Sequence, residues 1–134
     1  MSGRPGVTAR RGKRGRLSRS AEFDRVFRQG RSHANRVLVL YGFPRETNPP
    51  AQLRLGLSVS RRVGGAVERN HVKRLLREAF EQEAERIPPG HDVVLVARTE
   101  ARVVAERDGL DGIRAALAEL IDALRARVEG ERAR

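Results

Sequence analysis

The sequence predicts a single α/β (α+β) sandwich domain, in which helices cover a small central sheet. Three observations predict this fold. Two segments alternate between apolar and other residues as strands do, one segment is a continuous apolar run, and three segments carry apolar residues at helical spacing. The length of 134 residues suits one domain. The expected order of elements is α-β-β-α-β-α.

The first element is a helix expected over residues 20–29. Ser20 can cap its N-terminus, and a glycine follows its last residue. Phe23, Val26 and Phe27 recur at helical spacing. They form one apolar face, which we expect to pack on the sheet.

Two strands follow, over residues 36–43 and 53–60, with a proline-containing loop between them. In the first strand Tyr41 and Phe43 share one face with two valines, and two leucines lie on the other face. In the second strand apolar residues alternate with Arg, Gly and Ser. Both strands can therefore contribute to a core.

The second half of the chain contains the remaining strand and helices. A long helix is expected over residues 67–86. A strand over residues 92–98 contains five consecutive apolar residues, as expected for a strand buried on both faces. A last helix over residues 110–128 has a full apolar stripe. Residues 17–128 thus form the expected domain.

Charge is distributed unevenly along the chain, whose net charge is +11. Residues 1–77 hold 19 Lys and Arg against 4 Asp and Glu, whereas residues 78–134 hold 9 against 13. This basic first part indicates a polyanionic partner, with a generally cationic surface as the alternative. Residues 1–16 are expected to form a disordered basic arm, and residues 129–134 a flexible tail.

Composition argues against several classes of protein. There is no cysteine for a disulfide or a thiolate metal site, and the three histidines, His33, His71 and His91, lack metal-ligand spacing. No apolar segment is long enough to cross a bilayer, and no apolar region follows the basic N-terminus as in a secretory signal. We therefore expect a cytoplasmic protein without a membrane partner.

The long helix is predicted to carry a cationic face beside its apolar face. At about 100° per residue, this face holds Arg69, Asn70, Lys73, Arg74 and Arg77. Cations placed so close together repel one another unless an anion binds between them. Glycines before the helix also allow backbone N–H groups to approach a phosphate. A purely solvated face is the alternative interpretation.

A series of short motifs extends through most of the chain. The central ones are Gly56-Leu57-Ser58-Val59-Ser60-Arg61-Arg62-Val63-Gly64, Ala66-Val67 and Arg69-Asn70-x-x-Lys73-Arg74-x-x-Arg77. The flanking ones are Leu17, Phe23, Val26-Phe27, Gly30, Ala34-Asn35-Arg36, Leu40-Tyr41, Asp92 and Ala97-Arg98. Together they resemble the pattern of the bacterial ribonuclease P protein subunit, over residues 16–124. The pattern departs at His71, where that family usually has an arginine.

The resemblance implies an RNA-binding subunit that assists a catalytic RNA in removing the 5′ leader of precursor tRNA. The expected partners are then that RNA and precursor tRNA, without a small-molecule substrate. The residues implied in RNA contact are Arg61, Arg62, Arg69, Asn70, His71, Lys73, Arg74 and Arg77. Phe23, Phe27 and Tyr41 are implied in stacking on the single-stranded leader, with core packing as the alternative for the phenylalanines. A left-handed βαβ crossover around the long helix is also implied, against the usual hand.

We expect no catalytic residue in the chain, because no histidine pair, carboxylate cluster or activated nucleophile stands out. The resemblance implies an endoribonuclease whose chemistry belongs to the RNA. Mg²⁺ is then expected on the RNA and the substrate, and none on the protein alone. Two other functions stay open at this point: a structural, ribosomal-type RNA-binding protein and a stand-alone metal-dependent nuclease.

Overall fold

The computed structural model describes residues 15–17, 20–45 and 52–133, which form one α+β domain. None of the helices in these ranges combines the length and hydrophobicity that a membrane span requires. In chain order the elements are β1 (Gly15–Arg16), α1 (Ser20–Gln29), β2 (Arg31–Ala34), β3 (Leu38–Pro44), β4 (Arg54–Ser58), α2 (Ala66–Glu83), a 3-10 turn (Ala84–Arg86), β5 (His91–Ala97) and α3 (Glu100–Arg132).

The strands form one mixed sheet in the order β1-β4-β5-β3-β2. β5 runs parallel to β4 and antiparallel to β3, and therefore occupies the centre of the sheet. It is buried along nearly its whole length. This confirms the central strand that its continuous apolar run predicts.

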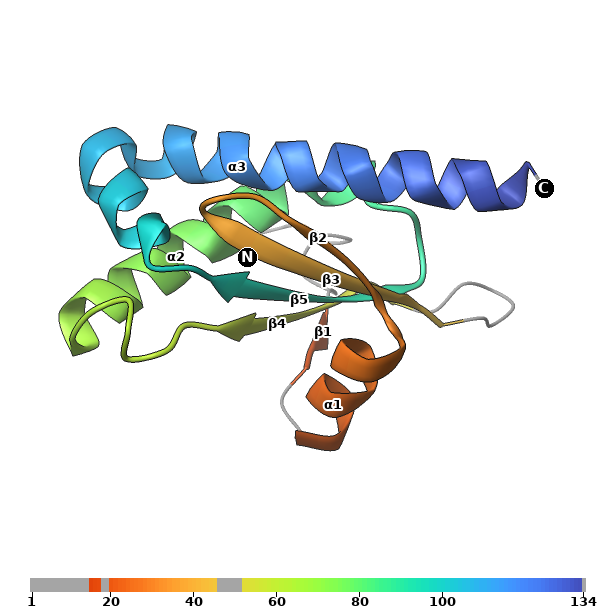
Figure 1. Cartoon of the computed structure of the whole chain (residues 1–134), viewed down its shortest axis with the longest axis horizontal. Coiled ribbons are helices and arrows are strands. Elements are labelled where there is room, and N and C mark those ends of the chain that lie inside the picture. The colour runs from red at the N-terminus through yellow and green to blue at the C-terminus, as the bar shows by residue number, and fades with distance from the viewer. Residues whose placement is uncertain (1–14, 18–19, 46–51, 134) are drawn as a thin grey trace, which may run out of the picture.

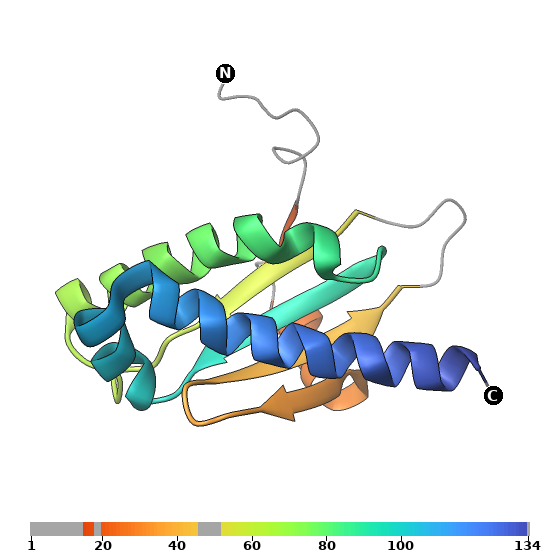
Figure 2. The same cartoon turned by 90° about the horizontal axis from the view of Figure 1, so that it is seen from above.

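Helices cover both faces of the sheet, as Figure 1 and Figure 2 show. α2 and α3 lie together on one face, and α1 lies on the other. The main core fills the space between the sheet and α2 and α3, and it includes Leu38, Leu40 and Leu95. A smaller core under α1 is centred on Val26 and Val94. The predicted sandwich of helices around a sheet is confirmed.

α2 connects two neighbouring parallel strands, β4 and β5. In Figure 2 α2 lies in front of the sheet. When the picture is turned so that β4 and β5 point up, β5 lies to the left of β4, which makes this crossover left-handed. Most βαβ units have the opposite hand. The crossover therefore agrees with what the family resemblance implies and not with the general rule.

The alternation of apolar residues predicts the faces of the strands correctly. Leu38 and Leu40 in β3 are fully buried in the main core, while Tyr41 and Phe43 pack in the smaller core under α1. Gly56 in β4 is buried close to α1, where a Cβ atom would lie 2.7 Å from the ring of Phe23. A glycine is thus required for α1 to lie this close to the sheet.

The predicted order of elements omits two short strands, β1 and β2. β1 occupies residues 15–16, so the prediction of a disordered arm over residues 1–16 is wrong for its last two residues. Residues 1–14 lie outside the described residues. β2 lies in a segment for which the sequence predicts no element. Both strands are short and mostly polar, and their pairing partners are β4 and β3. No periodic pattern of their own marks them.

The predicted helix boundaries are wrong at several ends. α3 begins at Glu100 and not at residue 110. Its first part precedes Gly109, whose φ of 63° interrupts the helix. α3 also continues to Arg132, so most of the expected flexible tail is helical. α2 ends at Glu83 and is followed by a 3-10 turn. The start and end of β3, β4 and β5 lie within two residues of the predicted ones.

Glu83 links α2 to α3. It is 5% exposed, and its carboxylate accepts hydrogen bonds from Arg86 and Arg114, each at 2.6 Å. The hydrogen bond from Arg114, followed by that from Arg86, lowers the pKa of Glu83 below its ordinary value of 4.5. Ionised Glu83 therefore stabilises the contact between the two helices.

We expect part of the acid sensitivity of the fold to come from Glu83. Because its pKa is lower in the folded protein, its stabilising contribution is complete above about pH 4.5 and is lost as the pH falls through the folded pKa. Glu83→Gln should lower the free energy of unfolding near neutral pH and flatten its decline in acid. Urea unfolding across this pH range tests the expectation, with the exposed Glu129→Gln as control. A decline as steep as in the unmodified chain would contradict it.

Candidate nucleic-acid interface

The residues implied in RNA contact lie on the turn before α2 and on one side of α2. Val63 is 3% exposed, and its backbone N–H donates to the carbonyl of Ser60 at 3.0 Å. This closed turn leaves Arg61 and Arg62 exposed. We name the whole set the basic helix surface; its members are Arg61, Arg62, Arg69, Asn70, His71, Lys73, Arg74 and Arg77.

The apolar side of α2 determines where its basic side points. Val72, Leu76 and Phe80 are buried in the main core, at the helical spacing that the sequence predicts. The polar residues between them therefore lie on the outer side of the helix. Among the α2 members of the basic helix surface, Asn70, Arg74 and Arg77 are exposed and the others are half-buried. The structure thus brings these predicted residues together along α2.

Arg74 has partners on its own helix. It forms an ion pair with Glu78 at 3.3 Å, and its guanidinium lies 3.0 Å from Nδ1 of His71. An ion pair between two exposed side chains contributes little to stability, so it leaves the cation available to an anion. His71, the residue that departs from the family pattern, contacts this arginine on the helix surface.

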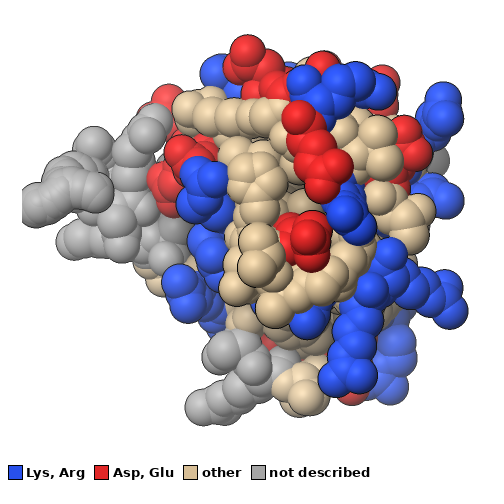
Figure 3. Space-filling view, turned by 90° about the vertical axis from the view of Figure 1, so that its left-hand side faces the viewer, with Lys and Arg blue, Asp and Glu red and all other residues tan. Residues whose placement is uncertain are grey.

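Charge separates across the molecule around these residues. Figure 3 views the end that carries the turn before α2. Lys and Arg side chains flank this end on both sides, while Asp and Glu gather mainly in the upper part, toward α3. The uneven charge along the sequence therefore becomes an uneven charge over the surface.

The three aromatic residues implied in leader binding lie together on the α1 face of the sheet. The ring of Phe27 lies edge-on to Tyr41, with 4.8 Å between centroids, and to Phe23, with 6.1 Å. We name Phe23, Phe27 and Tyr41 the aromatic surface. Phe23 and Tyr41 are half-buried against the smaller core, whereas Phe27 is 38% exposed. Packing against the smaller core therefore explains the position of the Phe23 ring in part, but it does not explain why much of the Phe27 ring is exposed.

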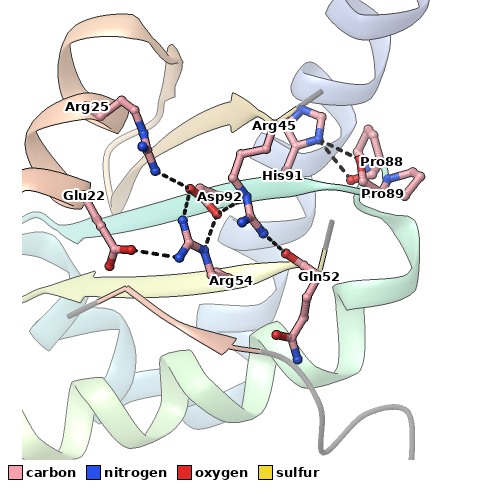
Figure 4. Close-up of polar contacts among 9 residues, drawn as sticks. All are labelled: Glu22, Arg25, Arg45, Gln52, Arg54, Pro88, Pro89, His91 and Asp92. Atoms are coloured by element: carbon pink, nitrogen blue, oxygen red, sulfur yellow. Dashed lines mark hydrogen bonds and ion pairs between the residues drawn. The ribbon is translucent and has the colours of Figure 1, made fainter. Parts of the chain in front are cut away.

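A buried carboxylate on the same face gathers three arginines, as Figure 4 shows. Asp92 in β5 is fully buried and binds Arg54 through both oxygens, at 2.8 and 2.7 Å. Its oxygens also lie 3.0 Å from Nε of Arg45 and 3.4 Å from the guanidinium of Arg25. We name Asp92, Arg25, Arg45 and Arg54 the Asp92 cluster.

The Asp92 cluster holds α1 on the sheet. Arg54 in β4 also donates to Glu22 in α1 at 2.8 Å, and the hydrogen bond to Asp92 raises the pKa of Arg54. Arg25 in α1 lies over the ring of Phe43, 5.5 Å from its centroid. Sequence reasoning missed this role, since its one local signal is an acidic residue at the start of an apolar strand. The cluster therefore positions the helix that carries two members of the aromatic surface.

A pocket of about 410 Å³ opens at the β4 edge of the sheet, and we name it the edge pocket. It brings Phe23 of the aromatic surface close to Lys73 and Arg77 of the basic helix surface. No sequence pattern predicts it. Its lining residues are Gly15, Arg16, Leu17, Phe23, Leu55, Gly56, Leu57, Lys73, Arg77, Phe80 and Glu81.

Metal-binding chemistry finds little support in the described part of the chain. Within it, no group of three or more His, Asp or Glu side chains is placed to hold a metal ion. His91 is buried, its Nδ1 lies 3.1 Å from the carbonyl of Pro88, and its burial lowers its pKa.

Comparisons with known proteins agree with one another. A family model described as Ribonuclease P matches residues 12–122. A ribonuclease P protein component from Shouchella clausii is 49% identical over 87 residues, which cover 65% of this chain and 70% of that protein. The structure of the Staphylococcus aureus RNase P protein matches with a TM-score of 0.70 and 32% identity, over 84% of this chain and 96% of that one. The Thermotoga maritima RNase P protein matches with a TM-score of 0.70 and 31% identity, over 81% and 96%.

Proposed function

The chain belongs to the ribonuclease P protein family, and we propose on this premise that it helps a catalytic RNA to remove the 5′ leader from precursor tRNA. The names of its relatives support a role in ribonuclease P. The observation that carries the finer assignment is the aromatic surface, in which the partly exposed ring of Phe27 lies 4.8 Å from that of Tyr41. Exposed aromatic rings suit single-stranded RNA, whose bases stack on them without a sequence requirement.

We assign the basic helix surface to the catalytic RNA. Folded RNA presents phosphates in a fixed arrangement, and arginines held along one helix can contact several of them at once. The two surfaces lie on opposite faces of the sheet, because α1 covers one face and α2 the other. The small domain therefore has room to bind the RNA partner and the leader at the same time.

Hydrolysis stays with the RNA partner in this proposal, together with the Mg²⁺ that supports it. The described residues of the chain bind and orient RNA and screen its phosphate charge. A structural RNA-binding protein would share the basic helix surface but would have no need to distinguish precursor from mature tRNA. Discrimination between these two substrates is therefore the property to measure.

Tyr41→Ala should weaken the binding of precursor tRNA to the holoenzyme more than the binding of mature tRNA, which has no leader. Stacking of one base contributes about 1–3 kcal/mol, so the loss for precursor tRNA should be about tenfold. Tyr41→Phe should be milder, since the ring remains. Equilibrium affinities for tRNA with and without a leader measure the effect.

The matched control is Val39→Ala, which truncates a half-buried residue of the same strand outside the aromatic surface. Melting curves of each variant show whether it is folded. If folded Tyr41→Ala loses the same affinity for both tRNAs, the assignment of the aromatic surface to the leader is wrong.

A further inference from the structure

The aromatic surface and the basic helix surface are separated by the sheet. α1 packs on one face, and α2 packs on the other (Figure 1). An RNA strand that contacts both surfaces therefore has to pass around an edge of the sheet. The path of such a strand depends on which of the two edges offers a site for it.

The two edges of the sheet differ. At the β2 edge, Arg31 forms an ion pair with Glu131 of α3. The side-chain amide of Asn35 donates to the carbonyl of Ala116 and to the carboxylate of Glu119, both in α3. At the other edge, β1 pairs with only the first two residues of β4. The edge pocket opens beside this short pairing. The β4 edge is therefore the one that offers space.

The lining of the edge pocket suits one nucleotide. Its volume of about 410 Å³ falls within the range of small-molecule sites. Phe23, Leu55 and Leu57 provide apolar walls against which a base can lie. Lys73 and Arg77 provide cations on one side for a phosphate.

The charge in the lining also favours an anion. Arg16, Lys73 and Arg77 are cationic, and Glu81 is the one carboxylate among the lining residues. Lys73 and Arg77 are four residues apart, so they lie on the same side of α2. Phe23 belongs to the aromatic surface as well, so the pocket is continuous with it. The pocket thus connects the two surfaces through residues that belong to each.

We propose that the edge pocket binds one nucleotide of the single-stranded leader where the leader passes from the aromatic surface around the β4 edge to Lys73 and Arg77, next to the residues of the basic helix surface that contact the catalytic RNA. The base lies against Phe23 and the leucines of β4, and the phosphate lies between Lys73 and Arg77. This inference rests on the proposed function, since it assumes a single-stranded RNA ligand at the aromatic surface. It adds a third contact site and the edge around which the strand passes.

Nuclear magnetic resonance of the isotopically labelled full chain tests the inference. The probe is a single-stranded RNA of about eight nucleotides, long enough to extend over all three sites. The backbone amide signals of Gly56 and Leu57 report on the edge pocket, and that of Tyr41 reports on the aromatic surface. All three should shift and saturate with the same dissociation constant.

The outcomes separate failure of this inference from failure of the proposed function. If Tyr41 and α2 shift at saturation while Gly56 and Leu57 do not, the edge pocket is not a nucleotide site, and the proposed function is unaffected. If the probe moves no signal of the aromatic surface, the proposed function and this inference both fail.

A pair of variants provides a second test. Glu81→Gln removes the carboxylate from the lining and should tighten binding of the same oligonucleotide about threefold at low salt, as expected for one partly screened charge. Glu85→Gln makes the same charge change at an exposed position outside the lining and should have a smaller effect. Equal effects of the two variants would overturn the inference.

Discussion

Replacing Asp92 with alanine should lower the free energy of unfolding by about 3–5 kcal/mol, the cost of removing one partner from a buried ion pair. Asp92 is fully buried and neutralises Arg54 through two hydrogen bonds, with Arg25 and Arg45 nearby. Without the carboxylate, three cations are left close together. Asp92→Asn should be less destabilising, because hydrogen bonding survives in part. Chemical denaturation measures both variants.

The matched control is Asp122→Ala. Asp122 also pairs with an arginine, Arg86, but its side chain is 66% exposed. An exposed pair of this kind contributes about 0–1 kcal/mol. If Asp92→Ala costs no more than Asp122→Ala, the Asp92 cluster does not hold α1 on the sheet. If folded Asp92→Asn no longer binds precursor tRNA more tightly than mature tRNA, the Asp92 cluster also positions the aromatic surface.

Neutralising Arg69, Lys73 and Arg74 together should greatly weaken binding to the catalytic RNA and make it less dependent on salt. Each phosphate contact contributes close to one unit to the slope of log K against log salt, so the slope should fall by about two to three units. The Arg74–Glu78 ion pair does not remove this effect, since both side chains are exposed. Affinity measured over a range of salt concentrations gives the slope.

A variant with the same change in net charge provides the control. Arg125, Arg127 and Arg132 lie in the last part of α3, at exposed positions outside the basic helix surface. Their triple alanine variant should retain most of the salt slope, because general charge reduction acts weakly over long distances in salt. Equal loss of slope in the two triple variants would mean that the basic helix surface has no special role.

Much of the fold follows from periodicity in the sequence. The helical spacing of Val72, Leu76 and Phe80 predicts the buried side of α2 and, with it, the basic side. The apolar run of β5 predicts the central strand. In contrast, β1 and β2 form because β4 and β3 offer them hydrogen bonds, and their own residues carry no pattern. The sequence predicts no helix before Gly109, where a φ of 63° separates the first helical residues from the rest of α3.

The candidate site was predictable only in part. The motif Arg69-Asn70-x-x-Lys73-Arg74 and the spacing of Phe23 and Phe27 are local, and sequence reasoning found them. The Asp92 cluster joins residues 38 and 67 positions apart, and such contacts are set by the pairing of strands and the docking of α1. The edge pocket likewise depends on how α1, β4 and α2 meet. Properties that depend on tertiary contacts leave no periodic trace in the sequence.

Reconstituted cleavage of precursor tRNA tests the central claim most directly. The assay compares the purified chain alone, the catalytic RNA alone and the two together, over a range of Mg²⁺ concentrations. We predict that the chain alone cleaves nothing. The RNA alone should be active only at high Mg²⁺, and the two together should release the 5′ leader at low Mg²⁺. Metal-dependent cleavage by the RNA-free chain, or no effect of the chain on the RNA, would contradict the account.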